Sequence, residues 1–215
     1  VAVIGGIKKV MPIAALPTSD TDEIIELLKE PYPQLVREQN VLSSDMSNNN
    51  AIIHPYPVML NTGWVEETKG GFKFYYDGIS RTIGRMVEAL DAERIEICKA
   101  LGIKVKDIKE SMFEYYSASG DTMYEIVRNV KGYAIVNAPP KLDTRLLTED
   151  IPMGLVPMTE IAKLVNVKTP VMDLAIDLAS ALLERDFRAE GRTLEKMGIS
   201  GMSKEDLLEL EEFKK

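Results

Sequence analysis

The chain has 215 residues, 45% of them hydrophobic, and its 34 acidic side chains outnumber the 26 basic ones. The net charge of -8 argues against a nucleic-acid-binding surface, because such a surface needs an excess of Lys and Arg to displace counterions from phosphates. The hydrophobic content is sufficient for a buried core, so a disordered chain is excluded. No apolar stretch is long enough to span a bilayer and no signal peptide is recognisable, so we expect no membrane association.

The chain contains one cysteine and one histidine. The lone Cys98 can form no disulfide within the chain, so nothing indicates an oxidising compartment, and we predict a soluble cytoplasmic protein. No group of His, Cys and carboxylate residues has the spacing of metal ligands, so we predict no metal site.

Residues 1–46 have the pattern of an α/β layer. Short apolar runs at residues 1–4 and 10–16 predict buried strands, and the segment that follows Asp20 predicts a short helix that ends before Pro31. A third short strand is predicted at about residues 40–43.

From residue 47 to residue 215 nearly all apolar patterns have the helical period, so we place a domain boundary near residue 46. Ser80 is expected to cap a long helix, with Ile83, Val87 and Leu90 among the residues of its buried stripe. Gly102 should end this helix, because a glycine readily adopts the left-handed conformation found at helix C-termini.

Further start signals predict additional helices in this second part. Two shorter helices are expected at about residues 106–116 and 121–129. Thr169 followed by Pro170 predicts another helix start, and Ser203 with Asp206 resembles a capping box before a last helix. The sequence therefore predicts a mainly α fold.

His54 is the one candidate in this chain for acid–base chemistry by an imidazole. Pro55 disfavours helical geometry at His54, which favours a position at a kink or helix end, and Asn50 would lie on the same helical face one turn earlier. The structural alternative is a histidine that is merely hydrogen-bonded in the core or at the surface.

Asp150 is the candidate partner of this histidine, because neighbouring apolar residues could bury its carboxylate beside the ring. The alternative is a solvated carboxylate at a helix start. Arg145 is the third candidate, since its guanidinium can bind a carboxylate ligand through two hydrogen bonds. Its alternative is a surface ion pair with Glu149.

Several separated motifs resemble one known family. The strings NNNAIIHPYPVMLNTG, GFKFYYDGIS, LDAERIEICKALG, TRLLTEDIPMGLVP and GRTLEKMGI look, in this order, like the C-terminal half of octopine/nopaline (opine) dehydrogenases. The resemblance implies an all-helical substrate/dimerisation-type domain at residues 47–215. Residues 1–46 would then be the last strands of a Rossmann-like α/β domain that binds NAD or NADP.

The resemblance also implies an activity, in which an amino acid and a 2-oxo acid condense to an imine that is reduced to a secondary amine, or the reverse. It assigns proton transfer to His54 and Asp150, and it assigns a substrate carboxylate to Arg145. Asn50 is a further candidate for substrate binding. Whether the protein forms a homodimer is left open.

One family feature is absent, because no glycine-rich dinucleotide fingerprint precedes the helical part. We therefore expect the chain to be part of a longer enzyme and to be inactive alone. Two alternatives stay open: a related NAD(P)-dependent dehydrogenase of 2-oxo or 3-hydroxy acids, and a non-catalytic helical module for ligand binding or dimerisation.

Overall fold

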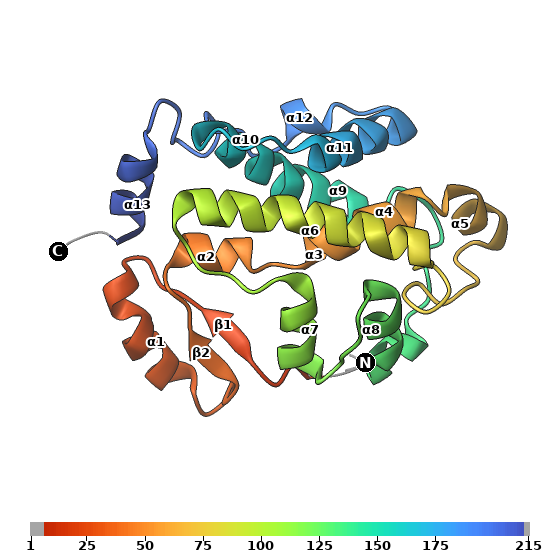
Figure 1. Ribbon diagram of the computed structural model, residues 1–215, viewed down its shortest axis with the longest axis horizontal. Helices are drawn as coiled ribbons and strands as arrows, with labels where there is room; N and C mark the ends of the chain where they lie inside the picture. The colour runs from red at the N-terminus through yellow and green to blue at the C-terminus, as the bar shows by residue number, and fades with distance from the viewer. Residues whose placement is uncertain (1–6, 213–215) are drawn as a thin grey trace.

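The structure, a computed structural model, describes residues 7–212, and these residues are mainly helical (Figure 1). The strand predicted at residues 1–4 lies outside this range. Strand β1 (Met11–Ile13) pairs in parallel with β2 (Leu35–Arg37), and α1 (Thr21–Leu28) connects them after a single 3-10 turn, η1 (Thr18–Asp20). The predicted α/β layer at the start of the chain is thus present as a small parallel sheet with one crossover helix.

The prediction of a third strand at residues 40–43 is wrong, because this segment begins helix α2 (Val41–Met46). Asn40 is the N-cap: its side-chain oxygen accepts a hydrogen bond from the Ser43 backbone, and the Ser43 hydroxyl accepts one from the Asn40 backbone. This reciprocal pair satisfies two N–H groups that a helix start otherwise leaves unpaired. The hydrophobic periodicity of so short a run does not distinguish a helix from a strand, so the polar cap decides between them.

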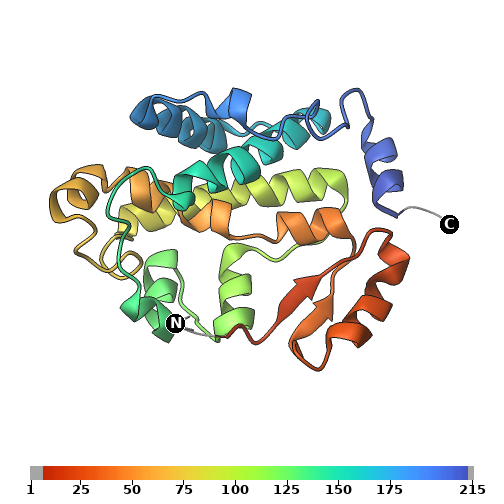
Figure 2. The ribbon, with the colours of Figure 1, turned by 180° about the vertical axis from the view of Figure 1, so that it is seen from behind.

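The remaining elements form a helical body. In chain order they are α3 (Asn50–Ile53), α4 (Pro55–Met59), α5 (Thr62–Thr68), α6 (Arg81–Leu101), α7 (Ile108–Tyr116), α8 (Met123–Asn129), the 3-10 helix η2 (Lys131–Ile135), α9 (Arg145–Thr148), the π-helix η3 (Ile151–Leu155), α10 (Val156–Leu164), α11 (Pro170–Leu183), α12 (Phe187–Glu190) and α13 (Lys204–Glu212). Helix α6 runs through the middle of this body. Helices α10 and α11 pack along one side of it, and α7, the sheet and α1 lie on the opposite side (Figures 1 and 2).

Both predicted ends of the long central helix α6 are confirmed. The Ser80 side chain accepts a hydrogen bond from the Ile83 backbone at its start, and Gly102 ends it with a φ of 80°. Ile83, Val87 and Leu90 are buried as predicted. The other helix starts are also confirmed: Asp107 and Thr122 cap the two shorter helices, and the last is preceded by the reciprocal hydrogen bonds of Ser203 and Asp206.

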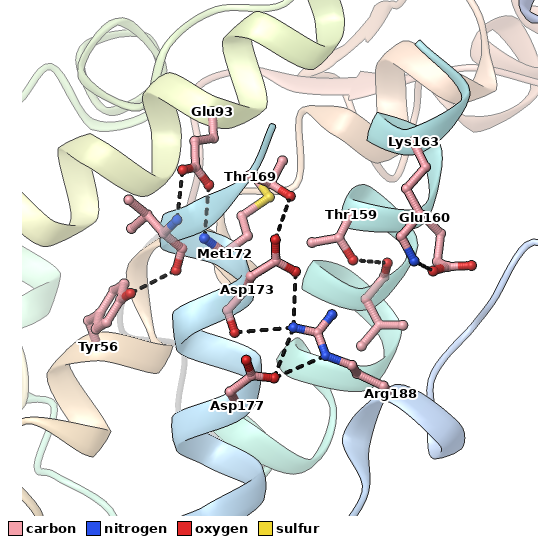
Figure 3. Close-up of polar contacts among 12 residues, drawn as sticks. Tyr56, Glu93, Thr159, Glu160, Lys163, Thr169, Met172, Asp173, Asp177 and Arg188 are labelled. Carbon is pink, nitrogen blue, oxygen red and sulfur yellow. Dashed lines mark hydrogen bonds and ion pairs between the residues drawn. The ribbon is translucent and has the colours of Figure 1, made fainter. Parts of the chain in front are cut away.

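Helix α11 is held to the body by a carboxylate from α6 (Figure 3). Glu93 accepts hydrogen bonds of 2.7 and 2.8 Å from the backbone N–H groups of Val171 and Met172, and the Tyr56 hydroxyl donates to the Val171 carbonyl. The first N–H groups of a helix have no partner within it, so these contacts fix where α11 starts. Helices α4, α6 and α11 are thereby joined at one point.

No helix within residues 7–212 combines the length and the apolar character that crossing a lipid bilayer requires.

Candidate active site

The backbone places His54 at a break between two short helices. Helix α3 ends at Ile53, and Pro55, which has no N–H to donate, opens α4. The His54 N–H still donates to the Asn50 carbonyl at 3.1 Å, so the turn before the break is regular. The predicted position of the imidazole at a helix end is confirmed.

The structure brings Asp150 to this histidine from 96 positions further along the chain. Nδ1 of His54 lies 2.7 Å from Oδ2 of Asp150, and the two side chains are only 10% and 12% exposed. Asp150 directly precedes the π-helix η3, whose first turn contains Pro152. A π-helical turn displaces the backbone relative to an α-helix, and such turns are frequent at functional sites.

A close approach of two backbones makes this contact geometrically feasible. A Cβ atom added to Gly154 would lie 2.5 Å from the Cβ of Ala51, well inside van der Waals contact. Glycine at this position therefore lets η3 pack directly on α3. The same two elements place Asp150 and His54 next to each other.

The second ring nitrogen of His54 contacts a residue that sequence reasoning missed. Nε2 lies 2.9 Å from the hydroxyl oxygen of Tyr75, in the loop between α5 and α6. A carboxylate can only accept a hydrogen bond, so in the neutral form of the ring the proton is on Nδ1 and Nε2 accepts a hydrogen bond from the Tyr75 hydroxyl. Burial raises the pKa of Tyr75 well above its usual value, which keeps this phenol a donor. The motif GFKFYYDGIS contains Tyr75, but nothing in it indicates which ring meets His54.

Aromatic rings connect Tyr75 with an open cavity. The rings of Tyr75 and Tyr133 are stacked at 3.8 Å between centroids, and Tyr116 lies 5.8 Å from Tyr133. Tyr116 and Tyr133 line a cavity of about 640 Å³, together with Lys9 and Lys131. The cavity is large enough for a small organic molecule and is lined by both aromatic and basic groups.

The side chains of the other two predicted site residues, Arg145 and Asn50, form no hydrogen bond with the side chains of His54 and Asp150. The Arg145 guanidinium makes two hydrogen bonds, of 2.6 and 2.8 Å, to the Glu149 carboxylate, and its side chain is 82% exposed. This is the surface ion pair that was the structural alternative. Asn50 is exposed, whereas its neighbour Asn49 is buried and, among the described residues, finds no hydrogen-bond partner for its side-chain amide.

Within residues 7–212, no group of three or more His, Cys, Asp or Glu side chains is placed to hold a metal ion.

Comparison with known proteins identifies the family. A family model described as "NAD/NADP octopine/nopaline dehydrogenase, alpha-helical domain" matches residues 37–183. The chain belongs to the octopine/nopaline dehydrogenase family. Opine dehydrogenase from Arthrobacter sp. (strain 1C) is 40% identical over 200 residues, which are 93% of this chain and 55% of that protein. Vitopine synthase from Allorhizobium ampelinum (strain ATCC BAA-846 / DSM 112012 / S4) is 30% identical, over 91% of this chain and 54% of its own length.

The fold is also found among solved structures of octopine dehydrogenase. A structure with NADH and L-arginine has a TM-score of 0.69 at 21% identity, and the match covers 92% of this chain and 55% of that one. A structure with NADH and pyruvate has a TM-score of 0.68 at 22% identity, and the match covers 98% of this chain and 58% of that one. The chain thus shares the fold of these octopine/nopaline dehydrogenases and spans about half the length of its relatives.

Proposed function

We propose that the complete protein is an opine-type dehydrogenase, and that this chain supplies its substrate domain and its proton-transfer residues. The substrates would be an amino acid and a 2-oxo acid, joined through an imine that is reduced to a secondary amine, or the reverse reaction. The observation that carries the proposal is the buried 2.7 Å contact between His54 and Asp150, in a chain 40% identical to an opine dehydrogenase. The solved relatives bound to L-arginine or pyruvate, an amino acid and a 2-oxo acid, support this choice of substrates.

The described residues do not fit a dinucleotide by themselves. The segment between β1 and α1 contains no glycine, so it cannot form the glycine-rich turn that brings a helix N-terminus to a pyrophosphate. We therefore propose that NAD or NADP binds mainly to another part of the complete protein, where its nicotinamide supplies the hydride. In this proposal residues 1–46 belong to that nucleotide-binding domain and residues 47–215 form the substrate domain.

His54 is proposed to take a proton from the substrate ammonium group and to return one to the hydroxyl that leaves the carbinolamine as water. Asp150 would hold the ring in one tautomer and stabilise the imidazolium form through the same hydrogen bond. Arg145 is proposed to bind a substrate carboxylate, for which it would have to exchange its partner Glu149, and Asn50 is kept as a candidate for substrate binding.

Steady-state kinetics of the complete protein test the two central roles. We expect His54→Gln and Asp150→Asn each to lower kcat/KM by about 10²–10⁴-fold, because each removes part of one acid–base unit. Glu66→Gln on α5, an exposed carboxylate, is the matched control and should behave as the unmodified protein. If both site variants turned over normally, the proton chemistry would have to lie elsewhere.

The choice of substrates decides between the proposed function and its alternatives. NAD(P)H oxidation is followed with a 2-oxo acid, with and without amino acids, and we expect oxidation only when both are present. NAD(P)H oxidation that does not require the amino acid would instead indicate a 2-oxo or 3-hydroxy acid dehydrogenase. If the folded protein oxidised NAD(P)H with no pair of 2-oxo acid and amino acid, a non-catalytic helical module would be favoured.

A further inference from the structure

Both ring nitrogens of His54 are occupied by protein groups. Nδ1 faces Asp150 and Nε2 faces Tyr75, and the side chain is 10% exposed. A proton that reaches or leaves this imidazole must therefore pass through one of these two neighbours. Asp150 is itself only 12% exposed, whereas Tyr75 contacts a residue that lines an open cavity.

Tyr133 is the next group beyond Tyr75: the two rings stack at 3.8 Å between centroids. Burial raises the pKa of Tyr75, and a hydrogen bond from Tyr133 partly offsets this rise. Burial also raises the pKa of Tyr133, so both phenols are neutral and each keeps a proton to donate. The Tyr133 hydroxyl also lies 3.7 Å from Met112 Sδ, but a thioether sulfur is a weak acceptor and does not compete with a phenol oxygen.

The proposed reaction needs such a connection. A substrate ammonium and a keto group lose water to form the C–N bond, and the product is again an ammonium. Charge and atoms balance only if the reduction takes up one hydride, from the nicotinamide donor, and one proton. A proton must therefore come from water for each turnover in the reductive direction.

We propose that Tyr75 and Tyr133 form a proton relay through which His54 exchanges protons with groups in the 640 Å³ cavity. In the inward direction the Tyr75 hydroxyl gives its proton to Nε2, Tyr133 replaces it, and water or substrate in the cavity replaces the proton of Tyr133. The outward direction reverses each transfer, so both phenols end each cycle unchanged. The relay rests on the proposed function and adds the route by which its proton moves.

The kinetic test uses Tyr75→Phe and Tyr133→Phe in the complete protein. Each change removes one hydroxyl and keeps the stacked ring. We therefore expect kcat to fall about tenfold or more, while the KM values for the amino acid and the 2-oxo acid stay within about twofold of those of the unmodified protein. Tyr56→Phe is the matched control: its hydroxyl donates to the Val171 carbonyl, outside the relay, so kcat should be unchanged. Unchanged kcat in Tyr75→Phe, or an equal loss in Tyr56→Phe, would overturn the relay.

A spectroscopic test does not depend on turnover. In protein labelled with ¹⁵N-histidine, the Nε2 resonance of His54 is identified by its loss in His54→Gln. Tyr75→Phe should move this resonance downfield, toward the position of an acceptor nitrogen without a hydrogen bond, and a resonance that does not move would overturn the contact. If the unmodified protein oxidised no NAD(P)H with any substrate pair, the proposed function would fail, and this measurement would still report whether Tyr75 donates to His54.

Discussion

At the scale of single residues, Cys98 illustrates how burial controls reactivity. The side chain lies in α6 and is 1% exposed. Burial raises the pKa of its thiol to about 11, and the nearby Arg94 lowers it only in part. With a pKa of about 11, only about one molecule in 10,000 carries the thiolate at pH 7. The thiolate is the reactive form of cysteine, so we expect little reactivity from Cys98.

We expect Cys98 to resist thiol-alkylating reagents in the folded protein and to react rapidly in denaturant. Its thiolate fraction rises about tenfold per pH unit below pH 11, but burial blocks access at every pH at which the fold persists. Mass spectrometry of the peptide that contains Cys98 measures the extent of labelling. Fast labelling at pH 7 without denaturant would show that α6 opens in the native state.

The site residues differed in how far the sequence could predict them. His54 was found because it is the only histidine, and Asp150 because apolar neighbours suggested burial and a family motif contained it. Tyr75 was missed, because its contact with His54 depends on the path of the loop before α6, and no local pattern encodes that path. For Arg145 the sequence offered two roles, and the structure contains the ion pair with Glu149.

At the scale of elements, the packing of η3 on α3 aligns the acid and the histidine. Gly154→Ala would place a methyl group 2.5 Å from the Ala51 Cβ, and both atoms are attached directly to backbone. We expect a loss of about 1–3 kcal/mol of stability and a fall in kcat, because the two elements must separate and lengthen the contact between His54 and Asp150.

Chemical denaturation and steady-state kinetics measure the two effects. Gly63→Ala in α5 is the control, since no heavy atom outside its chain neighbours and its own helix backbone lies within 4 Å of the added Cβ, and it should be neutral or slightly stabilising. Full activity and stability in Gly154→Ala would mean that the close approach is not needed.

The elements that the sequence predicted well are those with caps and a long period. Helix α6 has a serine before its first residue, a glycine after its last and an apolar stripe from Ile83 to Leu101 between them, so its bounds were predicted correctly. Helix α2 has six residues and too little periodicity to distinguish it from a strand. Its identity depends on the Asn40 cap, and Asn also favours the turns that separate strands.

At the scale of the whole molecule, one buried arginine joins three parts of the body. Arg94 of α6 is fully buried and donates to the Asp91 carboxylate, to the Met46 carbonyl at the end of α2 and to the Lys106 carbonyl before α7. The second Asp91 oxygen accepts from the Ile108 backbone. This cluster fixes α2 and α7 against the central helix.

We expect Arg94→Ala to lower the free energy of unfolding by about 3–5 kcal/mol, because it leaves the buried Asp91 carboxyl group without its cation. Urea denaturation followed by circular dichroism measures the loss. Arg85 is an exposed arginine on the same helix, and Arg85→Ala should change the free energy of unfolding by no more than about 0.5 kcal/mol. A loss below about 1 kcal/mol in Arg94→Ala would contradict this role.

The contact between His54 and Asp150 also has a consequence for folding. It closes a loop of 96 positions that contains every α-helix from α4 to α9. Closing so long a loop costs chain entropy that the packing of the intervening helices must offset, so we expect the pair to form late, after the central body has assembled. Regained helical signal after refolding is therefore no measure of a working site, whereas regained catalysis reports that the whole body has closed.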